Sequence, residues 1–172
     1  MNLASSDFEL FGVALRFEQD PAMLSERWKA LQATSHPDRF ASEGAAAQRV
    51  AMQWSVRINE AYQRLKDPLK RAAYLCTLHG VAIDAESNTA MPAEFLMRQM
   101  QWREALDEAT TEAAVDALAQ EVAQTQRDMV GSLRTLIDQQ QDWPAAAAQV
   151  RALMFVRRFA DDVARRLEAL QD

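Results

Sequence analysis

The chain has 172 residues and a formal net charge of −6, and 49% of its residues are hydrophobic. These values describe a globular protein of one large domain or two small ones. Only 4 Gly and 5 Pro occur, Ala, Leu, Gln, Arg and Glu are abundant, and no stretch alternates as a strand does. We therefore expect an all-α protein.

The charge is unevenly distributed along the chain. Residues 1–80 carry a net charge of +1 and residues 81–172 carry −7, which predicts two units with different partners. An acidic chain lacks the basic surface that nucleic-acid phosphates attract, so we expect no nucleic-acid partner. The sequence has no apolar run long enough for a membrane span, no leader-like start and a single cysteine, Cys76. A cytoplasmic protein with no membrane partner is the prediction.

The first 80 residues read as a series of helices. A short helix is expected from Asp7 to Val13, and Asp20-Pro21 is a good start for a helix that ends near Ser35. A turn over residues 36–44 leads to another long helix that ends at Lys66. Buried positions are predicted at helical spacing in both, at Leu24, Trp28 and Leu31 and at Val50, Trp54, Ile58, Ala61 and Leu65.

A fourth helix is predicted from Asp67-Pro68 to His79-Gly80, with Gly80 as the left-handed residue that ends it. Residues 81–91 lack helical periodicity and form the candidate linker. Three further helices follow, from Pro92 to about Asp107, over the repeat from Val115 to Leu136 (weakened by Gly131), and from Trp143-Pro144 to about Leu170. Short turns between three helices imply a three-helix bundle. The predicted division is residues 1–80, a linker at 81–91, and residues 92–172.

The tripeptide His36-Pro37-Asp38 lies in the turn of the first hairpin. Proline keeps the residue before it out of the α region, so the helix must end by Ser35. The ring of Pro37 stiffens the turn, and both polar side chains are expected to project into water. An imidazole and a carboxylate on a rigid loop suit docking to an arginine of a partner. The alternative is a capping turn in which Asp38 is a local acceptor.

The surroundings of the tripeptide favour docking. A Trp/Leu helix, the tripeptide, a long helix containing Ile58-Asn59-Glu60-Ala61-Tyr62, and then Asp67-Pro68 and Arg71-Ala72-Ala73-Tyr74 together resemble a J-domain over residues 7–79. The resemblance implies docking on the ATPase domain of a seventy-kilodalton heat-shock chaperone and stimulation of ATP hydrolysis there. It implies that the contacts are His36, Pro37 and Asp38, flanked by Arg27, Lys29 and Arg39. Ser35 departs from the family, which usually has an aromatic residue at that position.

Residues 93–109, placed on a helical wheel, have apolar residues on two faces. On a helical wheel Phe95, Trp102 and Leu106 fall within about 40° and form the core face, with Ala105 and Ala109 beside them. Leu96, Met97 and Met100 fall on the far side among charged residues. Such an apolar trio among charges indicates an interaction surface. The alternative is packing of the trio on the linker or on the N-terminal unit.

The last helix has a similar exception. Its core positions are predicted to be Leu153, Val156, Ala160, Val163, Leu167 and Leu170. Phe155 lies about 115° from the centre of that stripe, near Arg151 and Arg158. An exposed aromatic framed by arginines is a candidate hot spot for binding. Alternatively, arginine stems wrap it.

A J-domain followed by a small acidic helical bundle resembles the HscB-type co-chaperones of iron–sulfur cluster biogenesis. The local match covers Phe95-Leu96-Met97, Met100, Arg103-Glu104 and Leu106-Asp107-Glu108, with Phe155 in the last helix. The resemblance implies that Leu96, Met97, Met100 and Phe155 bind the iron–sulfur scaffold protein (IscU type). It also implies that the protein presents this scaffold to a chaperone of the HscA class and stimulates that chaperone's ATPase.

Other chemistry has little support in the sequence. One cysteine and two histidines do not make a four-ligand zinc site, so Cys76 is interpreted as a buried apolar residue and His79 as a helix-terminal cation or spectator. No phosphate loop or nucleophile motif occurs, so we expect no enzyme, cofactor or metal. Glu104, Asp107 and Glu108 are interpreted as solvated charges rather than metal ligands.

Three other readings remain as alternatives. The first is a J-domain co-chaperone that serves a different client. The second is a purely structural helical module in which the tripeptide has no role, and the third is an acidic-helix metalloenzyme.

Overall fold

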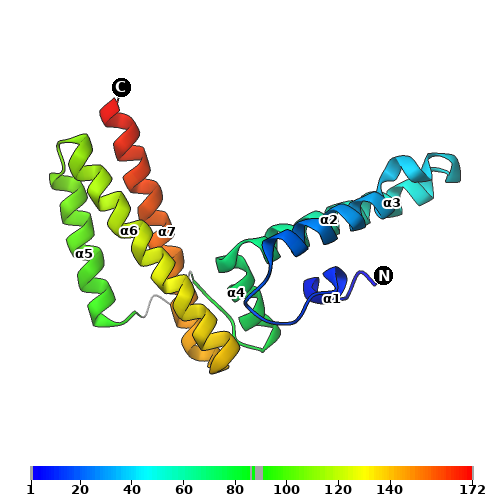
Figure 1. Cartoon of the computed structure of the whole chain (residues 1–172), viewed down its shortest axis with the longest axis horizontal. Helices are drawn as coiled ribbons and strands as arrows, with labels where there is room; N and C mark the ends of the chain where they lie inside the picture. The colour runs from blue at the N-terminus through cyan, green and yellow to red at the C-terminus, as the bar shows by residue number, and fades with distance from the viewer. Residues whose placement is uncertain (1, 86, 88–90, 172) are drawn as a thin grey trace. The chain divides into compact units, whose positions relative to one another are not determined.

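The computed structural model describes residues 2–85, 87 and 91–171 and contains only helices within that part of the chain (Figure 1). The predicted all-α class is therefore confirmed. The chain packs as two compact units, Met1–Leu75 and Cys76–Asp172. The predicted linker at residues 81–91 lies partly outside the described residues, because residues 86 and 88–90 are not described. The predicted domain boundaries stay a prediction.

The first unit begins with the short helix α1, Asp7–Phe11, held by a capping box. The hydroxyl of Ser6 accepts the backbone N–H of Glu9, and the Glu9 carboxylate accepts the backbone N–H of Ser6. Gly12 follows in the left-handed region with φ 62° and ends the helix. The helix therefore ends before Val13, the predicted end.

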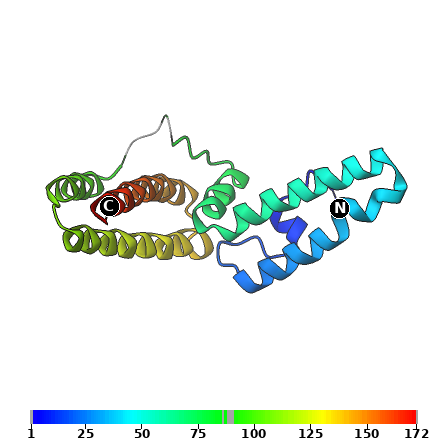
Figure 2. The ribbon, with the colours of Figure 1, turned by 90° about the horizontal axis from the view of Figure 1, so that it is seen from above.

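A hairpin of two long helices forms the body of this unit (Figure 2). Helix α2, Pro21–Ser35, is capped by the Asp20 side chain, which accepts the backbone N–H of Ala22 at 2.9 Å. A 3₁₀-helix η1, Pro37–Glu43, forms the tip, and α3, Ala45–Lys66, returns along α2. Helix α4, Pro68–Leu78, follows, with Gly80 just beyond it in the left-handed region at φ 77°. The predicted starts and ends of α2 and α3 are confirmed.

The core of the hairpin follows part of the predicted spacing, and the predicted positions Trp28, Leu31 and Trp54 are only half-buried. Leu24, Ile58, Ala61 and Leu65 are buried, but Val50 is exposed and Ala51 is buried instead. On a helix of 3.6 residues per turn, Ala51 lies about 20° from Ile58, whereas Val50 lies about 80° away. The predicted stripe was therefore shifted by one residue at the start of α3.

Polar contacts reinforce the hairpin beside this core. The ring of Trp28 stacks on that of Tyr62, with centroids 5.1 Å apart, and its Nε1 donates to Asn59 Oδ1 at 2.8 Å. The Asn59 oxygen also accepts from Gln32 Nε2 at 2.7 Å. Together these contacts fix the relative register of α2 and α3, which determines where the tip of the hairpin lies.

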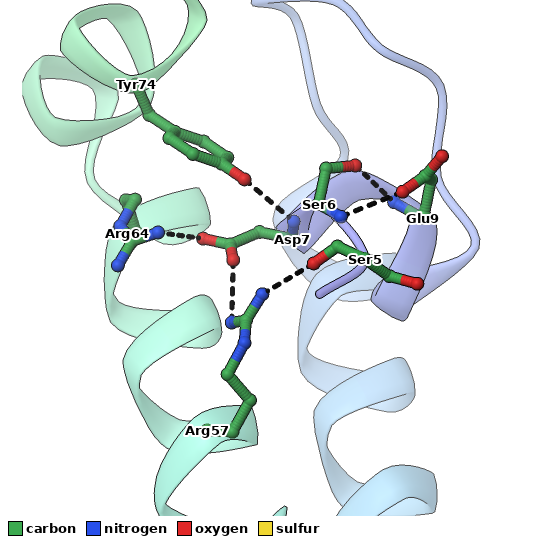
Figure 3. A network of polar contacts seen from close by, with 7 residues as sticks. All are labelled: Ser5, Ser6, Asp7, Glu9, Arg57, Arg64 and Tyr74. Carbon is green, nitrogen blue, oxygen red and sulfur yellow. Dashed lines mark hydrogen bonds and ion pairs between the residues drawn. The ribbon is translucent and has the colours of Figure 1, made fainter. Parts of the chain in front are cut away.

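A buried ion network ties the start of the chain to the hairpin (Figure 3). The Asp7 carboxylate is fully buried, with Arg57 Nη1 2.7 Å from one oxygen and Arg64 Nη1 3.0 Å from the other. The backbone N–H of Asp7 donates to the Tyr74 hydroxyl at 3.1 Å, and Arg57 donates to the Ser5 carbonyl at 2.9 Å. The Asp7 carboxylate thus joins α1 to α3, and the backbone N–H of the same residue joins α1 to α4.

The second unit contains the three predicted helices of the bundle. They are α5, Ala93–Glu108, α6, Glu112–Arg134, and α7, Trp143–Gln171. Helix α6 continues through Gly131 without a break and then widens into a single π-turn, η2, over Thr135–Gln139, which we did not predict. The Asp142 carboxylate accepts the backbone N–H of Ala145 at 3.1 Å and caps α7, with Pro144 in its first turn.

The core of the bundle lies where α5, α6 and α7 meet. It contains Trp102, Leu106, Val115, Leu118, Val122, Val156, Phe159 and Val163. The rings of Trp102 and Phe159 stack with centroids 5.6 Å apart, and Trp102 Nε1 donates to Glu121 Oε1 at 2.7 Å. Phe159 was missing from the predicted stripe although it lies only about 60° from Val156 on the wheel. Ala105, which we expected beside the core, is exposed.

Cys76 and His79 lie at the start of the second unit. Cys76 is a free, fully buried thiol, as expected, and burial raises its pKa to about 11. His79 stacks on Trp143 with ring centroids 3.6 Å apart. Within residues 2–85, 87 and 91–171, no helix is both long enough and apolar enough to cross a membrane.

Two candidate docking surfaces

The first candidate surface is the loop of His36, Pro37 and Asp38 at the tip of the hairpin. His36 is extended, with φ −64° and ψ 129°, so α2 ends at Ser35 as the following proline requires. The backbone N–H of Asp38 donates to His36 Nδ1 at 3.3 Å. Histidine, rather than Asp38, is therefore the side chain that caps the turn.

The Asp38 carboxylate points into solvent. Its side chain is 91% exposed, and one oxygen lies 3.5 Å from His36 Nδ1. The loop thus offers a carboxylate that accepts hydrogen bonds, with an imidazole beside it. A guanidinium of a partner matches such a carboxylate with two parallel hydrogen bonds.

The three predicted basic contacts differ in their surroundings. Arg39 Nη1 donates to the carbonyl of Ala33 at 2.8 Å and so satisfies a carbonyl in the last turn of α2. Arg27 and Lys29 are exposed and flank Trp28, which faces α3. Residues two apart lie on opposite sides of a helix, so these two cations border α2 on both sides rather than forming one basic patch.

The second candidate surface, the apolar face of the bundle, comprises Leu96, Met97, Met100 and Phe155. Their exposed fractions are 45%, 62%, 73% and 37%. The wheel therefore placed all four outside the core correctly. Single exposed apolar side chains are common on protein surfaces, but a cluster of them is unusual and is typical of a binding surface.

An ion pair between α5 and α7 lies on the same side of the bundle as three of these residues, Leu96, Met100 and Phe155. Arg103 Nη1 on α5 lies 3.0 Å from Asp162 Oδ2 on α7, and the two helices run in the same direction (Figure 1). Seven residues earlier, about two turns on each helix, are Leu96 and Phe155. Because the two helices run in the same direction, we infer that Leu96 and Phe155 lie at about the same level, with Met100 one turn after Leu96.

The ion pair also belongs to a wider contact that the sequence did not predict. The Arg103 guanidinium lies over the Phe159 ring, 5.1 Å from its centroid, and Asp162 also pairs with Arg165. The hydrogen bond from Arg103 holds the pKa of Asp162 below its ordinary value of 3.8. The sequence shows that Arg103 lies two helical turns after Leu96, on the same side of α5. It does not show that Asp162 on α7 is the partner of Arg103, because that pairing depends on how the two helices pack.

Comparison with known proteins shows the family to which this chain is similar. The family model of the HscB C-terminal oligomerisation domain matches residues 91–164. The chain is 51% identical to the co-chaperone protein HscB homolog of Bordetella petrii over 94% of this chain and 95% of that protein. It is 47% identical to the homolog of Burkholderia multivorans over 99% of both chains.

Solved structures show the same fold. The chaperone HscB from Vibrio cholerae superposes with a TM-score of 0.83 at 38% identity, covering 96% of this chain and 99% of that one. Human co-chaperone protein HscB gives a TM-score of 0.87 at 26% identity, covering 99% of this chain and 84% of that one.

The fold and the matched structures define the class as a J-domain joined to a C-terminal helical bundle, which confirms the predicted architecture. Within that class, the chain belongs to the HscB family of co-chaperones, the family that its sequence resembles.

Proposed function

We propose that this protein stimulates the ATPase of a seventy-kilodalton heat-shock chaperone of the HscA class and delivers the iron–sulfur scaffold protein (IscU type) to it. The observation that carries the proposal is the Asp38 carboxylate, 91% exposed on a proline-stiffened loop of a J-domain hairpin. In this proposal residues 1–80 act on the chaperone and residues 92–172 bind the scaffold. The protein itself breaks no bond, needs no cofactor or metal, and acts in the cytoplasm.

The chaperone contact rests on charge and rigidity. The Asp38 carboxylate accepts a bidentate pair of hydrogen bonds from an arginine of the ATPase domain, while His36 and Pro37 hold the loop that presents it. Arg27, Lys29 and Arg39 add electrostatic attraction at the rim, where they affect the association rate more than the affinity. The trigger for hydrolysis is therefore the single carboxylate.

The scaffold contact rests on apolar burial. Full burial of a large apolar side chain contributes roughly 1.5–3 kcal/mol. If Leu96, Met97, Met100 and Phe155 are all covered, the gross gain suffices for a contact of about micromolar strength after ordering costs. The Arg103–Asp162 pair keeps α5 and α7 in register, so the face is preorganised.

The chaperone role is tested by ATP hydrolysis with Asp38→Asn. This change keeps the size of the side chain and removes the charge, and the exposed position makes misfolding an unconvincing cause of lost activity. We expect stimulation to fall to near the basal rate. Asp116→Asn on α6 makes the same chemical change at another exposed site and should stimulate fully. Equal stimulation by wild type and Asp38→Asn would refute the role.

The scaffold role is tested by binding to a Leu96/Met97/Phe155 triple-alanine variant. We expect the dissociation constant to rise by about a hundredfold or more, because three exposed apolar side chains are removed from the face. The matched control is a Leu15/Met52 double-alanine variant, whose side chains are similarly exposed in the other unit. Undiminished binding by the triple variant would show that the client binds elsewhere or is a different protein.

The name of the matched family model, an oligomerisation domain, supports a second candidate function for the apolar face. In this candidate the face pairs with that of a second copy of the chain. Sedimentation at tens of micromolar separates the candidates. A wild-type dimer together with a monomeric triple-alanine variant supports self-association through this face, and a wild-type monomer rules it out.

A further inference from the structure

A second feature lies beside the tripeptide, an apolar hollow of about 350 Å³ at the tip of the hairpin. It is formed where α2 ends, η1 turns and α3 begins. Its volume is at the lower end of the range of small-ligand pockets, so it has room for one or two apolar side chains. The residues that form its walls include Ser35, Phe40, Ala47, Val50, Ala51 and Trp54.

The hollow has a simple cause in the sequence. Ser35, Ala47 and Ala51 are small residues at the point where the two helices face each other, and the larger Phe40 and Trp54 stand at the sides. Small side chains leave the space unfilled. Val50, which forms part of one wall, is consequently in contact with water and is 53% exposed. Covering an apolar wall that is open to water lowers the free energy and so favours binding of a partner.

The hollow is continuous with the proposed chaperone contact. Ser35 immediately precedes the tripeptide, and Phe40 follows Asp38 by two residues in η1. The lining residues Ser35 and Phe40 thus stand within three residues of Asp38 on either side of it, so a protein that binds Asp38 comes close to the hollow. Glu43 lines the hollow and places one carboxylate on its wall, in addition to the Asp38 carboxylate three residues after Ser35. A matching partner presents an apolar side chain next to a cation.

We propose that an apolar side chain of the chaperone's ATPase domain enters this hollow when an arginine of the same domain binds Asp38. This inference rests on the proposed function and adds to it a second, apolar point of contact. The ion pair alone selects any protein with an accessible arginine. The hollow requires an apolar side chain at a fixed distance from that arginine, and so it makes the docking specific for the chaperone.

The test compares two valines of α3 in binding to the isolated ATPase domain. Val50 lines the hollow and Val56 does not, and their exposed fractions, 53% and 50%, are nearly equal. We expect Val50→Gln to weaken binding about tenfold, because an amide must then be desolvated against an apolar side chain. Val56→Gln should bind within about twofold of wild type, the range expected for surface changes.

A second pair of variants fills the hollow instead of making it polar. Ala47→Phe places a ring in the hollow, whereas Ala46→Phe places the same ring on the neighbouring exposed position of α3. We expect weaker binding from Ala47→Phe alone. All variants are measured below the onset of their thermal unfolding, followed by circular dichroism, so that a loss of binding is not a loss of fold.

The outcomes separate this inference from the proposed function. If Asp38→Asn loses binding while Val50→Gln and Ala47→Phe bind as wild type does, the hollow is not occupied, and the co-chaperone role stands. Equal losses from Val50→Gln and Val56→Gln would mean a broad contact along α3 and would also overturn the inference. If the wild-type protein neither binds the ATPase domain nor stimulates it, the proposed function itself fails.

Discussion

Asp7 and Asp38 carry the same side chain in opposite surroundings within one unit. Asp7 is fully buried between Arg57 and Arg64, whereas Asp38 is almost fully exposed on the loop. A buried carboxylate requires partners because the loss of hydration is costly. An exposed carboxylate on a stiff loop remains free to bind a cation from another protein. The first is therefore structural, and the second is the candidate for function.

The stability of the first unit should depend on Asp7. Asp7→Asn leaves two arginines facing a neutral amide, and removal of one partner of a buried pair costs about 3–5 kcal/mol. We expect a loss of about 3 kcal/mol in the free energy of unfolding, measured by urea denaturation. Glu18→Gln, in the exposed pair with Arg16, is the comparison and should cost less than about 1 kcal/mol. Similar losses from both variants would contradict the assigned role of the network.

The buried thiol of Cys76 predicts a pH dependence. Burial raises its pKa from 9.0 to about 11 in the folded protein. A raised pKa means that the folded state favours the neutral thiol, so the stability it contributes is present below about pH 9 and is lost as the pH rises towards 11. Thermal unfolding of wild type and Cys76→Ala between about pH 9 and pH 11 tests this pH dependence. The difference between the two proteins should change with pH in that window, and a constant difference would contradict the assignment.

At the scale of elements, the contact between α5 and α7 predicts a change at acid pH. The pKa of Asp162 is lowered in the folded state, chiefly by the hydrogen bond from Arg103. The stability from this carboxylate is therefore present above its unfolded pKa and is lost as the pH falls through the lower folded pKa. We expect Asp162→Asn and Arg103→Gln to have melting temperatures below that of wild type at pH 7. The gap of Asp162→Asn should close once the pH falls below the lowered pKa of Asp162, and a gap that persists there would exclude the ion pair as its cause. Arg103→Gln also loses the contact with the Phe159 ring and should keep part of its gap at acid pH.

Helix boundaries were predictable where a local signal sets them. Asp20-Pro21 started α2 as expected, and His36-Pro37 ended it, because caps and proline act within one turn. The π-turn at Thr135–Gln139 has no comparable local signal and was missed. The burial of Ala51 in place of Val50 was missed because alanine gives a weaker hydrophobic signal than valine, although the two lie about 100° apart on the wheel and the neighbouring helix covers the side of Ala51.

The two candidate surfaces were predictable to different extents. Helical periodicity alone placed Leu96, Met97, Met100 and Phe155 outside the core, and proline geometry placed Asp38 in solvent. Periodicity does not show which helices meet at which level, so the alignment of Leu96 with Phe155 required the Arg103–Asp162 contact. The hollow beside the tripeptide was not predictable, because empty space depends on the packing of several side chains at once.

At the scale of the whole molecule, the two surfaces have complementary chemistry on one chain. The first unit presents a single rigid carboxylate, and the second presents four apolar side chains in an acidic half of the sequence. A charge contact of this kind suits a trigger, and an apolar contact suits holding a client. In the proposed function, joining the two surfaces raises the effective concentration of the client at the chaperone when hydrolysis is triggered.

Single-turnover ATP hydrolysis by the chaperone, with and without the scaffold, tests this claim most directly. With wild-type protein we expect scaffold and co-chaperone together to accelerate hydrolysis more than the product of their separate effects. The Leu96/Met97/Phe155 triple-alanine variant should keep its own stimulation and lose only the part that depends on the scaffold, whereas Asp38→Asn should lose both. Independent effects of scaffold and co-chaperone on the rate, or full cooperation by the triple variant, would contradict the account.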